Sequence, residues 1–180
     1  SIRRNAVDYT SRKSINFTNV RKIKTDPESK NHIWDVENWS ATYAYNEYNH
    51  RDFINEKSLQ KTYRAGLAYN FSAPAKIITP FEKLIKSKNL SLLRDINFSL
   101  LPSVLNFRID VDRLYSENTL RNNDPNNFLP TTTFNKNFQM TRLYGISWNL
   151  TRSMQIDLNA TNYSIVDEPD GRVNGLVRDT

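Results

Sequence analysis

The sequence predicts an all-β protein built from five or six long antiparallel strands. Apolar and polar side chains alternate one by one over most of the chain, which is the period of a strand with two unlike faces. The alternating runs reach about 9 to 13 residues, whereas strands of globular proteins average about 5 to 6. Helix signals are confined to one short segment. We therefore expect long strands with almost no helix.

The N-terminal half contains two clear alternating runs and one weaker one. Ile15 and Phe17 indicate a short strand in an otherwise irregular stretch. In "NWSATYAYNEYN", residues 38–49, the first eight places put the bulky rings on one face and the amides and hydroxyls on the other. The run "KTYRAGLAYNF", residues 61–71, separates two sets in the same way. Its ring-bearing set comprises Tyr63, Ala65, Leu67, Tyr69 and Phe71.

The C-terminal half repeats the pattern. "LNFRIDVDR", residues 105–113, alternates apolar residues with charged ones and Asn106. "FQMTRLYGISWNL", residues 138–150, alternates less strictly, because Arg142 and Leu143 break its two sides. Alternation resumes at Met154 after "TRS", so we expect a tight hairpin there.

Two segments need separate explanations. Ile96, Phe98 and Leu100 occupy even positions, but the next strand uses odd ones, so a β-bulge is expected at "LLPS", residues 100–103. Within the connection 72–95, "TPFEKLIKSK" has Thr79 as a helix N-cap, followed by proline and, three residues after the cap, glutamate. That pattern predicts one short helix.

The length of the runs favours a membrane-spanning barrel, because a tilted strand crosses a bilayer in about 9 to 11 residues. The chain lacks the run of about 18 apolar residues that a transmembrane helix needs. Mid-strand charges suit a water-filled lumen, and rings near strand ends suit the aromatic girdles of outer-membrane barrels. The expected lumen-facing residues are Arg64, Arg108, Asp110 and Asp112. The expected lipid-facing or girdle residues are Trp39, Tyr43, Tyr45, Tyr69, Phe71 and Trp148.

The connections suggest an orientation. If the short "TRS" turn is periplasmic, strand counting puts 72–95 and its helix on the same side, and the polar stretches 50–60 and 114–137 outside the cell. Bacterial barrels start at about eight strands, so five or six cannot close. We therefore expect residues 1–180 to be an internal stretch of one larger outer-membrane barrel and not an independent domain.

Enzyme, metal and nucleic-acid functions find little support. There are no cysteines, and His32 and His50 are not accompanied by a cluster of carboxylates, so neither a metal nor another cofactor is expected. Asp110 and Asp112, with Glu117 nearby, can serve acid–base work or calcium binding, but Arg108 and Arg113 favour a solvated charge lattice.

No Ser-His-Asp set or phosphate-binding loop is evident, so the chain is expected to be non-enzymatic. The net charge of +6 is scattered, and the rings lie opposite the charges, which argues against nucleic acid.

Several runs resemble one family. They are "NFTNVRK" at 16–22, "HIWDVENWSATYAYNEYNHRDF" at 32–53, "QKTYRAGLAYNFS" at 60–72, "NFSLLPSVLNFRIDVDR" at 97–113, "LRNND" at 120–124 and "RLYGISWNLTRSMQIDLNATNYSIVDEPDGR" at 142–172. Together they resemble the SprA/Sov family of gliding-motility proteins, the outer-membrane translocons of the type nine secretion system of Bacteroidetes.

The resemblance implies a very large transmembrane barrel in the outer membrane of a Gram-negative bacterium, exporting folded cargo proteins. The partners implied are the remainder of the barrel, a periplasmic plug protein, a PorV-type cargo-collecting barrel, secreted cargo and outer-membrane lipid. It implies no catalytic residues.

Two alternatives stay open. The first is another large outer-membrane barrel, of the TonB-dependent receptor or lipopolysaccharide-assembly type. The second is a soluble β-sandwich binding module, in which the ring-bearing face would pack against a second sheet.

Overall fold

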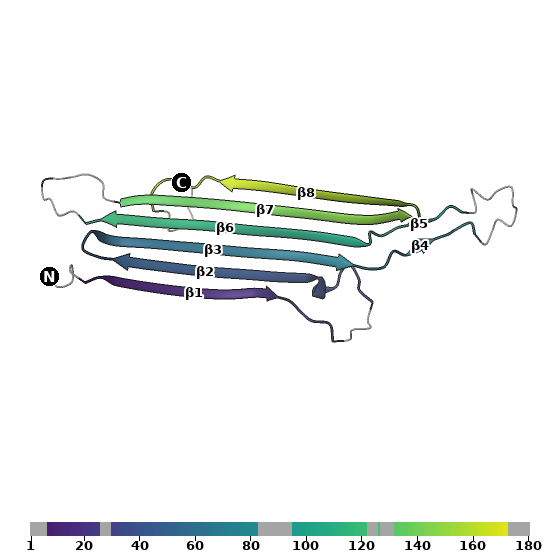
Figure 1. Cartoon of the computed structure of the whole chain (residues 1–180), viewed down its shortest axis with the longest axis horizontal. Helices are drawn as coiled ribbons and strands as arrows, with labels where there is room; N and C mark the ends of the chain where they lie inside the picture. Colours follow the sequence, from purple (N-terminus) through teal and green to yellow (C-terminus); the bar gives the residue numbers. More distant parts are fainter. Residues whose placement is uncertain (1–6, 26–29, 83–94, 122–125, 127–131, 173–180) are drawn as a thin grey trace, which may run out of the picture.

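The computed structural model describes residues 7–25, 30–82, 95–121, 126 and 132–172. Over these residues the chain forms a six-stranded antiparallel sheet and a separate two-stranded arm (Figure 1). The all-β class and the antiparallel sheet are thus confirmed. The sheet does not close on itself, and β1 and β8 form its two edges.

The strands of the sheet follow one another in chain order, with the arm inserted between β3 and β6. They are β1 (Tyr9–Val20), β2 (Trp39–Arg51), β3 (Asn55–Ser72), β6 (Val104–Leu120), β7 (Thr132–Thr151) and β8 (Met154–Val166). The arm pairs β4 (Ile77–Ile78) with β5 (Phe98–Ser99). All six expected strands are present, and the weakly signalled strand around Ile15 is a full one.

Register across the sheet decides which side chains share a face. Because directly opposed residues of antiparallel strands point the same way, the pairs Trp39–Tyr69 and Tyr69–Phe107 put rings of β2, β3 and β6 on one side. Phe107 in turn opposes Tyr144 of β7. We call this side the ring-bearing face, and the opposite side the polar face.

The ring-bearing face carries a broad apolar zone, which we call the apolar band. On β7 it runs from Phe138 to Trp148. Its further members are Ile15, Phe17, Ala41, Tyr43, Tyr45, Tyr63, Ala65, Leu67, Phe71, Leu105, Ile109, Val111, Met140, Ile146, Ile156, Leu158, Ala160 and Val166. Most of the band is open: the buried apolar residues among those described are Tyr69, Phe71 and Tyr115 alone. In the described residues, no second sheet covers it.

The strands continue past the band at the end where β2 joins β3, which we call the distal end. The stretches 50–60 and 114–137, expected as loops, are largely strand, since β3 begins at Asn55, β6 ends at Leu120 and β7 begins at Thr132. That expectation was wrong because these segments are predominantly polar and lack the regular alternation of the central runs. Charge pairing takes the place of apolar burial there, as in the pair of Lys57 with Glu117 at 3.0 Å.

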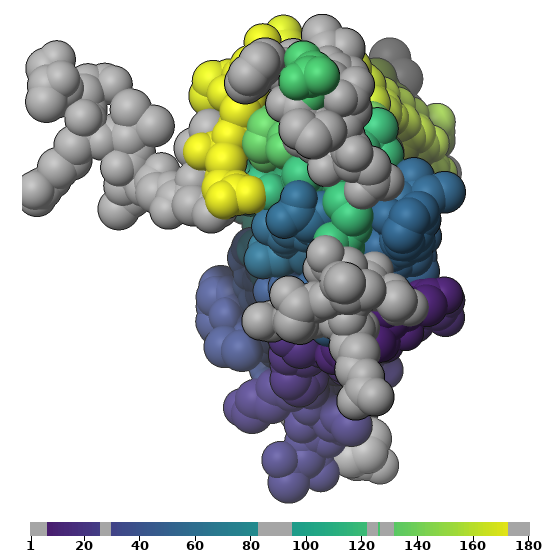
Figure 2. Space-filling model, turned by 90° about the vertical axis from the view of Figure 1, so that its left-hand side faces the viewer, coloured from purple at the N-terminus to yellow at the C-terminus, as the bar shows by residue number. Residues whose placement is uncertain are grey.

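A segment after β8 folds back onto the ring-bearing face at the distal end. Glu168 accepts from Arg113 of β6 at 2.5 and 3.0 Å, and Arg172 pairs with Glu117. Figure 2 shows the yellow residues of this segment on one side of the sheet, which is seen end-on. Glu117 is 1% exposed and also accepts from the Tyr115 hydroxyl at 3.1 Å. The distal ends of β3 and β6 and the chain after β8 are therefore tied to one carboxylate.

At the opposite, proximal end the expected hairpin is confirmed, since β7 ends at Thr151 and β8 begins at Met154. The bulge expected at residues 100–103 is absent. Phe98 and Ser99 leave the main sheet and pair with β4 in the arm, so β6 starts afresh at Val104 with its own phase. The change of sheet, and not an inserted residue, accounts for the shift of alternation.

The helix expected over residues 79–88 lies largely outside the described residues. Its first residues, Thr79 to Glu82, form an irregular turn. The described residues contain one helical turn, the 3-10 segment η1 (Val36–Asn38). No helix among them is long and apolar enough to cross a membrane.

Removing the shared carboxylate should loosen the distal end. We expect Glu117→Gln to lower the free energy of unfolding by about 1–2 kcal/mol, below the roughly 3–5 kcal/mol of a fully buried pair, because both cations stay partly exposed. Denaturant unfolding in detergent micelles measures this change. Glu56→Gln, at an exposed position of the neighbouring strand β3, is the control and should stay within about 0.5 kcal/mol of the parent protein. Equal stability of the two variants would contradict the role assigned to Glu117.

Candidate functional site

The polar face carries the four charged residues expected there, at the middle of β3 and β6. Arg64 pairs with Asp112 across the two strands at 2.8 Å. Arg108 donates to both oxygens of Asp110 at 2.6 and 2.9 Å. The side chains of Arg64 and Asp112 are 69% and 52% exposed, so this is a solvated lattice of opposite charges. Such pairs add little stability, about 0–1 kcal/mol each.

Gly66 makes room for this lattice. It lies opposite Asp110 in the ladder, and a β-carbon at position 66 would meet the Oδ1 atom of Asp110 at 2.9 Å. The Asp110 carboxylate therefore lies close to the backbone of β3 while it keeps its bidentate contact with Arg108. Together with Thr42 and Gln139, these residues line an open polar hollow across the centre of the sheet.

Two residues expected in this lattice lie elsewhere. Arg113 and Glu117 share the ring-bearing face, since they oppose Tyr63 and Leu59, and both take part in the distal contacts. The expectation was wrong because it grouped odd and even positions of β6, whose side chains point to opposite sides of the sheet. Asp110 and Asp112 do share a face, but each has an arginine beside it. Among the described residues no group of three histidine or acidic side chains can hold a metal ion.

The six expected ring residues all lie on the ring-bearing face. Trp39 packs on Tyr69 with ring centroids 5.0 Å apart, in a tilted geometry. Tyr43 and Tyr45 follow along the same side of β2. Tyr45 in turn packs on Tyr63, also at 5.0 Å. Tilted aromatic pairs of this kind stabilise neighbouring strands by about 0.5–1.5 kcal/mol beyond the area they bury.

Polar ring atoms at the two borders of the band find partners beyond it. At the proximal border the Tyr69 hydroxyl donates to the Ile33 carbonyl at 2.6 Å, and the Trp148 indole donates to the Ser99 carbonyl at 2.9 Å. At the distal border the Tyr45 hydroxyl donates to Glu47 at 2.5 Å. The rings are therefore apolar toward the band and polar at its rims.

The distal rim is a row of charges. Lys13, Glu47 and Lys61 oppose one another on β1, β2 and β3, and both lysines pair with the glutamate, at 3.2 and 3.7 Å. The same ladder row continues through Tyr115 to Lys136. The side chains change from apolar to charged between one ladder row and the next, so the band has a sharp boundary on this face.

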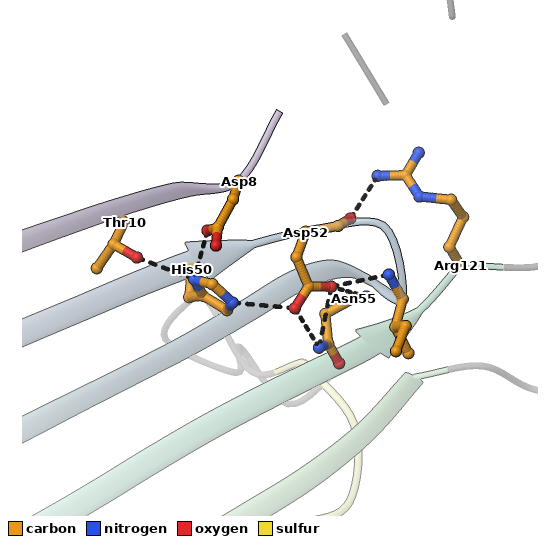
Figure 3. Close-up of polar contacts among 7 residues, drawn as sticks. Asp8, Thr10, His50, Asp52, Asn55 and Arg121 are labelled. Atoms are coloured by element: carbon orange, nitrogen blue, oxygen red, sulfur yellow. Dashed lines mark hydrogen bonds and ion pairs between the residues drawn. The ribbon is translucent and has the colours of Figure 1, made fainter. Parts of the chain in front are cut away.

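A polar cluster at the tip of β2 was not found from the sequence. His50 lies between Thr10 of the edge strand, with Oγ1 and Nδ1 2.9 Å apart, and Asp52 of the turn, with Nε2 and Oδ2 3.1 Å apart (Figure 3). Asp8 approaches the same imidazole at 3.5 Å. Only the spacing of His50 and Asp52 is visible in the sequence, because Thr10 reaches the site through strand pairing.

The cluster closes the turn between β2 and β3. Asp52 accepts the backbone amides of Ile54 at 2.8 Å and Asn55 at 2.5 Å, and Arg121 donates to its carbonyl at 3.2 Å (Figure 3). The amides of Asn55 lower the pKa of the Asp52 carboxyl to about 2. A hydroxyl, an imidazole and a carboxylate in line resemble a hydrolase triad. Here, however, the carboxylate is engaged by the turn it closes, and turn closure explains the arrangement.

Comparison with known proteins adds no family. No protein-family model matches the chain, and no curated protein matches it.

The turn should depend on pH only in strong acid. Because the pKa of Asp52 is depressed, its stabilising contribution is fully present above the unfolded-state pKa near 3.9 and is lost as pH falls through about 2. Carbon-13 NMR of labelled aspartate, assigned with Asp52→Asn, measures the midpoint. We expect a midpoint near 2, whereas a midpoint near 3.9 would show that the turn amides do not hold the carboxylate.

Proposed function

We propose that this chain is a stretch of wall in a transmembrane β-barrel, with the ring-bearing face toward lipid and the polar face toward a water-filled passage. The observation that carries the proposal is the exposed apolar band, which extends across all six strands. Soluble monomers rarely leave a contiguous apolar area larger than a few hundred Å² open to solvent. An apolar face of this extent needs a cover, and among the described residues the chain covers only its two ends.

The height of the band suits the hydrocarbon layer. The ten residue steps from Phe138 to Trp148, at about 3.4 Å each, cover roughly 34 Å along the strand. A strand tilted by about 40° would then span about 26 Å, close to the roughly 25 Å of the apolar zone of outer-membrane barrels. The tyrosines and charged row at the distal rim, and Trp39, Tyr69 and Trp148 near the proximal rim, correspond to the two interfaces.

A membrane-spanning sheet needs more strands than these six, because the backbone groups at its two edges must form hydrogen bonds. In hydrocarbon every amide and carbonyl needs a partner, so a spanning sheet must close. The outer edges of β1 and β8 are open in the described residues, and six strands are fewer than the about eight of the smallest bacterial barrels. The proposal therefore makes this chain an internal part of a larger barrel, completed by further strands.

The proposed role is passage of folded proteins across the outer membrane, in type nine secretion and gliding motility. Support comes from the family-specific runs quoted above and from the chemistry of the polar face. That face has mainly small, amide and hydroxyl side chains, apart from Leu143, Tyr163 and Ile165 on β7 and β8. Arginines and aspartates are paired in equal number at its centre. A wall of this kind neither adheres to apolar surface nor attracts one sign of charge, so cargo can slide along it.

The partners proposed with this role are a periplasmic plug protein, a PorV-type barrel that collects cargo, and the cargo itself. The location proposed is the outer membrane of a Gram-negative bacterium of the Bacteroidetes. Another large outer-membrane barrel would share the band and the lumen. The quoted runs favour the translocon over that alternative, and the open ring-bearing face favours either barrel over a soluble sandwich.

A charge placed on each face should separate lipid from water. Ala65 lies in the band and Ala68, three residues later, lies on the polar face of the same strand. In lipid vesicles we expect Ala65→Lys to lower the free energy of unfolding by about 1–3 kcal/mol, because Ala65 lies between the distal rim and the midplane of the band, and Ala68→Lys to lower it by less than about 1 kcal/mol. Equal effects of the two substitutions would refute the assignment of faces.

A further inference from the structure

The apolar band is interrupted at one place, on the distal half of β7 and β8. Arg142 and Asn162 oppose each other on the ring-bearing face, and Ser164 lies on the same side of β8. We call these three residues the polar patch. The ladder row on its proximal side holds Tyr144 and Ala160, and the row on its distal side holds Phe138 and Val166. The patch is therefore an island within the band and not part of its rim.

The patch arises from a local exchange of polar and apolar side chains on β7 and β8, and not from one stray arginine, because Leu143 of β7 also points to the polar face. On β8 the ring-bearing face is apolar up to Ala160 and again at Val166, and between them Tyr163 and Ile165 point to the polar face instead. These two side chains are 54% and 60% exposed there. Pairing of β7 with β8 is continuous from Phe138 to Asn149, so no bulge turns the strand. The residues themselves, and not the register, change the character of the two faces.

Arg142 has no acidic partner among the described residues. Its guanidinium contacts the sulfur of Met140 at 3.7 Å, and its ladder neighbour on β6 is Ile109. Every other arginine of the central rows is paired: Arg64, Arg108 and Arg113 each have a carboxylate within 2.8 Å. An arginine facing lipid near mid-bilayer is unfavourable. The cost is removed if a protein surface with a carboxylate covers the patch.

We infer that the polar patch docks a second integral membrane protein, which presents an aspartate or glutamate at the depth of Arg142 and polar atoms to Asn162 and Ser164. The inference rests on the proposed function, because it assumes that the rest of the band meets lipid. Charge complementarity selects the carboxylate. The apolar rows on either side would continue the contact within the membrane, as in an interface with a polar centre.

Photo-crosslinking in intact outer membranes tests the inference. A benzoylphenylalanine in place of Ser164 should form a protein adduct, and one in place of Ala65, in the same band on β3, should not. In the Ser164-substituted protein, Arg142→Glu should reduce the adduct by roughly tenfold or more, as expected when one partner of a desolvated charge pair is reversed. Arg142→Lys should retain most of it, because the lysine keeps the charge.

Three results would overturn the inference: no adduct at position 164, an adduct of equal yield at position 65, or an adduct that survives Arg142→Glu. A spin label at position 65 separates these from a failure of the proposed function. If that label is accessible to lipid-soluble oxygen and no adduct forms at 164, only the docking is wrong. If that label is reached by a water-soluble nickel complex instead, the lipid-facing band itself is wrong.

Discussion

The side-chain period of two, kept in phase from strand to strand by backbone pairing, is the constraint on which both faces depend. A slip of one residue in any pair would carry the rings of one strand onto the face of its neighbour's charges. The register shifts that do occur lie near strand ends, after Phe17, at Asn55 and at Asn149. The central rows are uninterrupted, so the band and the charge lattice lie back to back through one layer of backbone.

That arrangement explains why the strands are so long. Their central part is organised by unlike faces, and their distal part by charge pairing around Glu47 and Glu117. The second kind of organisation suits an aqueous setting, because the lysines and the arginine that pair with these two carboxylates stay partly exposed to solvent. The distal ladders and the segment held by Glu168 are therefore suited to the space beyond a bilayer. The apolar part is suited to its interior.

The sequence alone was sufficient to predict the central strands and the face on which their side chains lie. Trp39, Tyr69 and Trp148 could be assigned to one face because alternation is local and each strand repeats it. The distal extensions could not be assigned, since residues 55–60 and 114–120 are mostly polar without regular alternation, which is typical of loops. Contacts that depend on pairing between distant segments, such as Thr10 with His50 or Arg172 with Glu117, leave no trace in a single sequence. The bulge was predicted wrongly because the alternation of apolar and polar residues also changes phase when a chain leaves the sheet and returns to it.

The central claim is that adjacent residues of one strand meet different solvents, and spin-label accessibility measures this directly. With the protein in lipid bilayers, a label at Tyr63 should be relaxed by molecular oxygen dissolved in the acyl chains, and one at Arg64 by a water-soluble nickel complex. The account predicts this opposite response for the two neighbours. Equal access of both labels to the lipid-soluble quencher would contradict it.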